Sequence, residues 1–460
     1  MTERLAPYVW LVVAAVAAGY ANALGAAFQF DDWNVVVRDA RVQSLAAWWH
    51  SMPGIRPLLK LSYAANHASG DDPFGFHAVN VVIHAANSAL VLALLFRLAR
   101  RDGLTADSSR LAALTGALIF ALHPVQTEAV TYVSGRSSSL SALFALGSVL
   151  AAIDGLEKGR RALLFGLSPA LFACALGVKE IAVAVPAAIL LWCGTDRRKP
   201  LRLREAVRAV SGHLAVLALV GGLVAASATY RSLAARSLEL RTPAENLLVQ
   251  VNGVSYLVGQ LVRFDRLNAD PMVAGAVAWS PIFALKLVAL LSVLALGMMT
   301  LRARPALAFG ILWFVVWLLP TNSLIARLDV ANDRQLYLAL AGPAWLVGRW
   351  VAAMPFRRDA VIPAVAAAAF VFGVVTLDRN RLYADEVRFW EDVVRKTPGN
   401  ARALNNLGYA YALACRTEDA DAAFVLAIDL LPDDPKGVAN LALLREGALL
   451  PPEDSRCVGG

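Results

Sequence analysis

Long apolar runs are the sequence feature that most limits how this chain can fold. Eleven runs approach the roughly 20 residues that a helix needs to cross a bilayer, at 8–28, 76–98, 110–126, 137–155, 162–178, 180–194, 208–230, 280–300, 305–320, 335–352 and 360–377. Of the 460 residues, 58% are hydrophobic and only 17% are charged, whereas soluble domains carry about 25% charged residues. An ordinary soluble enzyme is excluded. We predict an all-α polytopic membrane protein with about 11 transmembrane helices within residues 1–378.

Basic residues gather on every second loop between these runs. They are Arg4; Arg97, Arg100, Arg101 and Arg110; Lys158, Arg160 and Arg161; Arg197, Arg198, Lys199, Arg202, Arg204 and Arg208; Arg302 and Arg304; and Arg349, Arg357 and Arg358. Because loops rich in Lys and Arg stay in the cytoplasm, the N-terminus is expected inside and the chain after residue 378 outside. The net charge of +8 follows from this asymmetry and does not indicate a nucleic-acid partner. The first run lacks a convincing signal-peptide cleavage site and is expected to remain as an anchor in the lipid bilayer.

Two of the loops expected outside, 29–75 and 231–279, are too long to be simple connectors. The first contains an amphipathic stretch, Leu45–Met52, with Trp48 and Trp49 adjacent. Paired tryptophans suit either a helix that lies in the membrane interface or an aromatic belt. Large loops on one face indicate that the protein works at that face.

The cysteines are widely spaced. Cys174, Cys193, Cys415 and Cys457 show no CxxC pattern, which predicts neither a disulfide framework nor a zinc site. The charge asymmetry places the last two outside, where a thiol reagent that cannot cross membranes should label them.

Charge returns after the last apolar run, together with the spacing of a tetratricopeptide (TPR) repeat. With Ala401 as position one, the diagnostic residues are Leu407, Gly408, Tyr411, Ala420, Phe424, Ala427 and Pro432. We therefore predict a TPR-like helical domain over 379–448 and a flexible tail over 449–460. Repeats of this kind bury their faces against neighbours, so the domain is expected to lean on the membrane domain or on a partner. A helical cap without a ligand is the alternative.

Polar residues also occur inside the second apolar run. His77, Asn80, His84 and Asn87 fall within one narrow arc of a helix and must face other helices or a cavity. Two histidines seven residues apart could bind a metal, but no third ligand is obvious. Hydrogen bonding between helices is the preferred interpretation.

Charged residues cluster where the apolar runs meet the outer face. The clusters contain Asp31 and Asp32; Arg56 and Lys60; His123, Gln126, Glu128 and Arg136; Lys179 and Glu180; and Asp333, Arg334 and Tyr337. Acids and fixed cations together suit a reaction in which a carboxylate removes a proton and cations hold a leaving phosphate. Each group has a simpler alternative: an arginine can snorkel, Lys179 and Glu180 can form a structural ion pair, and Asp31-Asp32 can cap a helix.

The order of these segments resembles the GT-C glycosyltransferases, and within them the TMTC group of transmembrane and TPR-containing O-mannosyltransferases. Six segments carry the resemblance: Phe30-Asp31-Asp32, Arg56-Pro57-Leu58, His77 to His84, His123 to Val130 with Gly135-Arg136, Lys179-Glu180, and Arg334 with Leu336-Tyr337. Two features depart from the family. This chain carries about two TPR repeats where family members carry many, and Gln126 stands where the family has a second histidine.

The resemblance implies an inverting transferase that moves one mannose-like sugar from a polyprenyl-phosphate donor to a hydroxyl group of an exported protein, with the TPR domain as a possible acceptor contact. It implies Asp32 or Asp31 as the base, and donor-phosphate contacts from Arg56, His123, Arg136, Lys179 and Arg334. The supporting polar residues are Lys60, His77, Asn80, His84, Glu128, Glu180 and Tyr337. Trp33 and the apolar end of the first run would partly desolvate one of the two carboxylates. We place the base at Asp32 because of its distance from that membrane end. No metal cofactor is required, although adjacent carboxylates could hold a divalent ion.

The composition, rich in Ala, Leu and Arg, indicates a bacterial homologue in the cytoplasmic (inner) membrane, with its active face and TPR domain periplasmic or extracellular. Three alternatives remain open: a glycosyltransferase acting on a glycan or lipid of the cell envelope, a transporter, and a membrane TPR scaffold. A transporter would place its charges near the midplane of the bilayer, and a scaffold needs no acidic pair.

Overall fold

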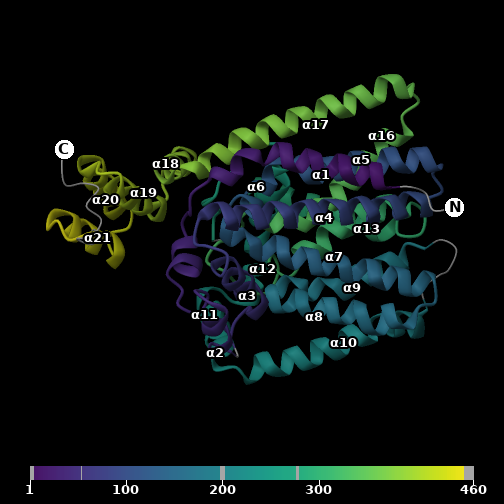
Figure 1. Ribbon diagram of the computed structural model, residues 1–460, viewed down its shortest axis with the longest axis horizontal. Helices are drawn as coiled ribbons and strands as arrows, with labels where there is room; N and C mark the ends of the chain where they lie inside the picture. Colours follow the sequence, from purple (N-terminus) through teal and green to yellow (C-terminus); the bar gives the residue numbers. More distant parts are fainter. Residues whose placement is uncertain (1–4, 53, 197–201, 276–278, 450–460) are drawn as a thin grey trace.

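A computed structural model describes residues 5–52, 54–196, 202–275 and 279–449. Within these ranges every regular element is a helix. Figure 1 shows a bundle of roughly parallel and antiparallel helices with a smaller group of helices, α18 to α21, at one end. We call this end of the bundle the tail end.

The helices of the bundle vary widely in length. They are α1 (Ala6–Gly19), α4 (Pro73–Arg101), α5 (Ala106–Leu122), α6 (Thr127–Val130), α7 (Arg136–Glu157), α8 (Ser168–Val178), α9 (Val185–Gly194), α10 (Leu203–Ala226), α12 (Pro243–Gln260), α13 (Pro281–Met299), α14 (Pro305–Leu318), α15 (Leu336–Ala339), α16 (Ala341–Ala353) and α17 (Arg358–Asn380). Short helices α2 (Leu45–His50), α3 (Pro57–His67) and α11 (Ala228–Leu240) lie at the tail end, together with the loops around them. The long loops 29–75 and 231–279 are thus largely helical.

Five helices in the described part of the chain are long and apolar enough to cross a membrane, and up to seven qualify if each of two bent pairs is one span. The bent pairs are Ala106–Leu122 with Pro124–Val130, at 48°, and Asp333–Ala339 with Ala341–Ala353, at 52°. Shorter apolar helices at Ala6–Gly19, Leu163–Val178, Glu180–Gly194 and Pro305–Leu318 coincide with other expected spans. The chain has the apolar helices of a multi-pass membrane protein, and the count of eleven spans stays a prediction.

Small residues let the central helices approach closely. A Cβ atom on Gly348 of α16 would lie 2.2 Å from the carbonyl oxygen of Ala112 in α5, and one on Gly342 would lie 2.3 Å from the carbonyl oxygen of Gly310 in α14. Such contacts replace the hydrophobic driving force that is absent between helices in lipid. By contrast, α10, α13 and α17 bury only 11–17% of their most apolar windows and lie at the periphery, where lipid would cover them.

The C-terminal helices α18 (Glu386–Lys396), α19 (Ala401–Leu413), α20 (Thr417–Leu430) and α21 (Pro435–Arg445) pack on one another and on the bundle. Gly408 of α19 lies against the ring of Phe424 in α20, where a Cβ atom would come within 2.8 Å. This contact explains a glycine and an aromatic residue at two of the diagnostic positions. The TPR-like assignment of the domain and its boundaries stay predictions.

The structure corrects one expectation about cysteine. Cys415, in the turn between α19 and α20, is disulfide-bonded, so it would react with a thiol reagent only after reduction. Cys174 and Cys193 are not disulfide-bonded. Six features named from the sequence lie outside the described residues: Arg4, Arg197, Arg198, Lys199, Cys457 and, apart from residue 449, the expected flexible tail.

Candidate functional site

A cavity of about 280 Å³ at the tail end gathers much of the charge predicted for the site. Its walls contain the cations Arg41, Arg56, Lys60, Lys179, Arg327 and Arg334 and the acids Asp31 and Asp39. We call it the cationic pocket. The excess of positive charge in a small, partly enclosed space favours the binding of an anion, because an anion offsets the electrostatic repulsion between neighbouring cations.

Asp31 occupies a special position in this wall. It also lines a second, larger cavity of about 1010 Å³ between the loop 27–38 and the helices α18 and α19, which we call the interdomain groove. The backbone N–H of Asp31 donates a hydrogen bond to the hydroxyl of Tyr132, at 3.1 Å. Burial raises the pKa of the Asp31 carboxyl above its usual range, and the nearby Arg334 and Arg402 oppose part of this rise. Asp31 is therefore a carboxylate that is more basic than an ordinary aspartate, and it faces both cavities.

The adjacent Asp32 is fully buried and lines neither cavity. One carboxylate oxygen accepts hydrogen bonds from the backbone N–H (2.7 Å) and the hydroxyl of Ser134, and the other accepts from the backbone N–H of Gln29, at 3.0 Å. Burial raises the pKa of Asp32 to about 7, although these hydrogen bonds stabilise its ionised form. Through these hydrogen bonds, Asp32 links the loop 29–75 to the residues just before α7.

The backbone around the two acids is strained at Phe30. This residue has φ of 48°, in the left-handed region that non-glycine residues rarely occupy, and Arg56 has φ of 51°. Arg56 lines the cationic pocket and Phe30 lines the interdomain groove, and strained residues often occur at functional sites. Phe30 directly precedes Asp31, which lines both cavities, and Asp32, which is buried in the core.

Arg334 is held by acids at the bend between α15 and the preceding loop. Its Nε lies 3.6 Å from Oε1 of Glu128, and its backbone N–H donates to Oε2 of the same carboxylate, at 2.8 Å. Arg379 lies 3.7 Å from Asp333 beside it. Glu128 therefore serves Arg334 as a fixed counter-charge and does not itself line the cationic pocket.

Arg56, Lys179 and Glu180 also meet where the sequence predicted. Arg56 Nη2 lies 2.8 Å from Oε2 of Glu180, and the Nζ of Lys179 donates to the hydroxyl of Ser138, at 2.7 Å. The adjacent Lys179 and Glu180 thus do not pair with each other; each binds a different element. Lys179 is buried and lines the pocket, and burial together with the neighbouring Arg334 and Arg56 lowers the pKa of its ammonium group well below the usual range.

Arg327 lines the pocket and was missed from the sequence. It lies in an irregular segment after α14, with no motif and no span end beside it. Burial and the neighbouring Arg334 and Arg56 lower the pKa of Arg327 to about 10, so it stays charged at neutral pH. The only available signal was a basic residue in a loop on the face where basic residues are depleted.

Arg136 corrects a prediction, because its guanidinium does not reach the pocket. Its donors bind Asn80 Oδ1 and Asn66 Oδ1, both at 2.6 Å, and the carbonyl of Phe76, at 2.9 Å. The guanidinium also stacks over the ring of Tyr63, at 4.9 Å. Arg136 is fully buried and joins α3, α4 and α7, away from the pocket lining.

The polar seam of α4 binds neighbouring helices. His84 Nε2 lies 2.9 Å from the carbonyl of Ala121 and must donate to it, so Nδ1 accepts from the hydroxyl of Tyr337, at 2.8 Å. Asn87 donates to the same hydroxyl, at 2.9 Å. His77 is buried and lines neither cavity. The preferred interpretation, hydrogen bonding between helices, agrees with these contacts.

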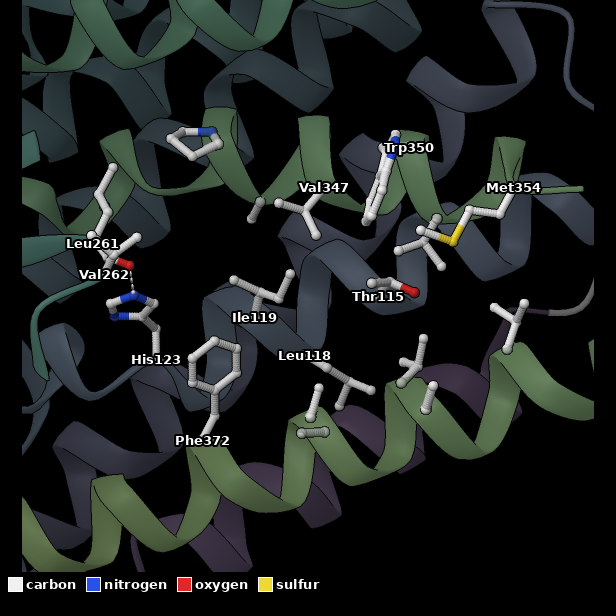
Figure 2. A pocket seen from close by; sticks show the side chains of 18 of the residues that line it. Thr115, Leu118, Ile119, His123, Leu261, Val262, Val347, Trp350, Met354 and Phe372 are labelled. Atoms are coloured by element: carbon white, nitrogen blue, oxygen red, sulfur yellow. Dashed lines mark hydrogen bonds between the residues drawn. The ribbon is translucent and has the colours of Figure 1, made fainter. Parts of the chain in front are cut away.

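His123 is also placed away from the cationic pocket. It lines an apolar cavity of about 850 Å³ between α5, α16 and α17, shown in Figure 2. Its Nε2 lies 3.1 Å from the carbonyl of Leu261, and its Nδ1 accepts from the backbone N–H of Val125. With both ring nitrogens bound to backbone, His123 holds the bend after α5. It is not positioned to bind the donor phosphate.

Among the described residues, no cluster of three or more His, Cys, Asp or Glu side chains could hold a metal ion. Asp31 and Asp32 point apart, so they do not offer the paired oxygens considered for a divalent ion. Metal dependence stays untested.

The chain is similar to several curated proteins. It is 34% identical over 175 residues to the human protein O-mannosyl-transferase TMTC4, with 33% of this chain and 24% of that protein aligned. It is 31% identical over 217 residues to the Drosophila melanogaster protein O-mannosyl-transferase Tmtc2 (42% and 21% aligned), and 36% identical over 140 residues to the mouse protein O-mannosyl-transferase TMTC1 (28% and 14%). The chain thus spans about a quarter or less of the length of these relatives. No protein-family model and no solved structure matches it. The matches support a TMTC-like glycosyltransferase.

Proposed function

We propose that this TMTC-like chain is an inverting GT-C glycosyltransferase that moves a mannose-like sugar from a polyprenyl phosphate to a hydroxyl group of a protein. The observation that carries the proposal is the position of Asp31, which lines both the cationic pocket and the interdomain groove. The names of the relatives supply the sugar and the class of acceptor. The membrane is proposed to be the cytoplasmic membrane of a bacterium, with the tail end outside.

The proposed reaction is a single displacement. The Asp31 carboxylate takes the proton of the acceptor hydroxyl as its oxygen attacks the anomeric carbon of the donor sugar. The bond between that carbon and the phosphate oxygen breaks on the opposite side, so the configuration inverts. The phosphate leaves as an anion, and Arg56, Lys179, Arg327 and Arg334 would neutralise it. Cations fixed before the reaction stabilise the developing charge without reorganising.

This proposal moves the base from Asp32 to Asp31. A base must lie within hydrogen-bond reach of the proton that it removes. Asp32 is fully buried and already accepts hydrogen bonds from Ser134 and Gln29. Asp31 lies one residue away, beside both cavities, with a raised pKa that increases its basicity.

Asp31→Asn tests the proposal in detergent or liposomes, with a synthetic polyprenyl-phosphate mannose and a serine-containing peptide. The amide keeps the size of the side chain but cannot accept the proton, so kcat should fall about 10³-fold while the affinity for the donor changes little. Asp71→Asn is the matched control, because Asp71 lies in the same loop but its side chain is 81% exposed. Normal turnover by Asp31→Asn would refute the proposed base.

A further inference from the structure

The interdomain groove runs between two structural units that share a core. Phe30 of the loop and Trp390 of α18 meet edge to face, with ring centroids 5.2 Å apart. Tyr132, whose hydroxyl binds the backbone of Asp31, belongs to the same apolar cluster as Tyr383 and Leu407. The C-terminal helices are therefore built into the wall of the site, and their position relative to Asp31 is set by packed aromatic residues.

The lining of the groove combines apolar, amide and charged groups of both signs. The loop contributes Phe30, Trp33, Asn34 and Arg38; α18 contributes Glu386, Val387 and Trp390; α19 contributes Arg402, Asn405, Asn406, Tyr409 and Leu413; and Asp434 and Lys436 lie at the start of α21. The charges nearly balance, which disfavours a polyanion such as a nucleic acid or an anionic lipid surface. A lining that mixes apolar and amide groups instead suits a polypeptide, which presents side chains and main-chain polar groups in turn.

Asn406 provides an independent sign of a ligand. Its side-chain Nδ2 lies buried at the wall of the groove and has no hydrogen-bond partner. A buried donor left without an acceptor costs about 1–3 kcal/mol, so native structures rarely keep one without a reason. An incoming main-chain carbonyl would satisfy it.

We propose that the groove binds the acceptor as an extended, unfolded polypeptide segment, in which a main-chain carbonyl accepts from Asn406 and one hydroxyl side chain reaches Asp31. This inference rests on the proposed function and specifies its acceptor. A folded domain would present its hydroxyls on a convex surface, whereas Asp31 lies recessed between two walls. An extended segment is narrow enough to enter, and recognition through the main chain leaves its sequence largely free.

Binding of a fluorescein-labelled peptide of nine residues with one serine, measured by anisotropy on the full-length protein, tests this inference without turnover. Asn406→Leu should weaken binding about 5- to 10-fold by removing one buried hydrogen bond. In the transfer assay the same variant should raise KM for the peptide and leave kcat unchanged. A scrambled peptide should bind within about threefold of the original, and a peptide with an ester in place of one central amide should bind more weakly, because an ester carbonyl is a poorer acceptor. Asn252→Leu, on α12 and outside the groove lining, is the matched control for folding.

A peptide with a benzophenone side chain keeps the test valid if Asn406→Leu does not fold. Cross-linked to the wild-type protein, it should label residues of the groove lining, within 27–38, 385–390, 402–414 and 431–436. Labelling elsewhere, or equal affinity of Asn406→Leu and wild type, would overturn the groove assignment. So would tighter binding of a folded acceptor domain than of its unfolded form. Peptide binding without any transfer would instead refute the proposed function and leave the groove assignment intact.

Discussion

The cationic pocket and the apolar cavity beside α17 lie in the same bundle and differ in every respect that matters for chemistry. The apolar cavity is about three times larger, 850 against 280 Å³, yet His123 is the one titratable residue in its lining. The cationic pocket holds six cations and two acids in the smaller space. Keeping charges away from water costs free energy, so a protein retains them together where they act. Charge density, and not volume, marks the candidate site.

The largest effect beyond Asp31 is expected from removing a pocket cation. Arg334→Gln should lower kcat about 10²- to 10³-fold, because one fixed charge opposite the leaving phosphate is lost. The variant also leaves Glu128 buried without its counter-charge. The double variant Arg334→Gln, Glu128→Gln should therefore recover thermal stability without recovering turnover. Recovery of both would mean that Arg334 has a structural role alone.

Lys179→Met should lower kcat about 10-fold to 100-fold while the protein stays folded, because the methionine chain fills the space of the lysine stem. Ser138 loses only one hydrogen bond, which is worth about 1 kcal/mol. Steady-state kinetics with varied donor concentration check the prediction. Lys286→Met on α13, which is not in the pocket lining, is the control.

The pH dependence of kcat/KM sharpens the comparison further. Burial raises the pKa of Asp31, and a base works only when deprotonated, so activity should fall with decreasing pH at a value above the usual range of an aspartate. Arg402 partly opposes this rise. Arg402→Gln should therefore move the acid limb to still higher pH, by a fraction of a unit. A shift to lower pH would contradict the assignment of Asp31 as the base.

The smallest effect is expected in the apolar cavity. His123→Gln, which keeps a donor for the carbonyl of Leu261, should leave transfer within about threefold of wild type and lower the melting temperature by only a few degrees. A loss comparable with that of Arg334→Gln would mean that the apolar cavity belongs to the active site after all.

Much of the site was predictable because the constraints on it are local. A bilayer demands apolar runs, the distribution of Arg and Lys separates two faces, and acids beside cations on one face indicate a polar reaction. Arg56, Lys60, Lys179 and Arg334 do line one pocket. The failures have a common cause, since position at the end of a span does not determine which way a side chain points. The chain bends by 48° after His123, which sends the imidazole into the apolar cavity, and Arg136 turns inward to the amides of α3 and α4.

The choice between two adjacent acids lay beyond sequence reasoning for the same reason. Asp31 and Asp32 differ by one position in a loop, and only the folded loop places Asp31 beside the cavities and Asp32 in the core. The preceding Phe30 has a positive φ, for which phenylalanine carries no sequence signal, and its ring packs against Trp390. The position of Arg327 in the pocket could not be predicted from the sequence either, because only the folded chain brings its loop beside Arg56.

The two bent helix pairs are joined through one side chain, Gln126, whose Nε2 donates to the carbonyls of Phe120, at 3.3 Å, and Tyr337, at 3.2 Å. Gln126 and Phe120 belong to the first pair and Tyr337 to the second, so moving the two bends apart would break the hydrogen bond to Tyr337. The two bent segments, which carry Glu128 and Arg334, should consequently move as one rigid unit. Any motion that admits or releases a substrate should then occur in the loops that cover these segments. The distance between Glu128 and Arg334 should stay constant through each turnover.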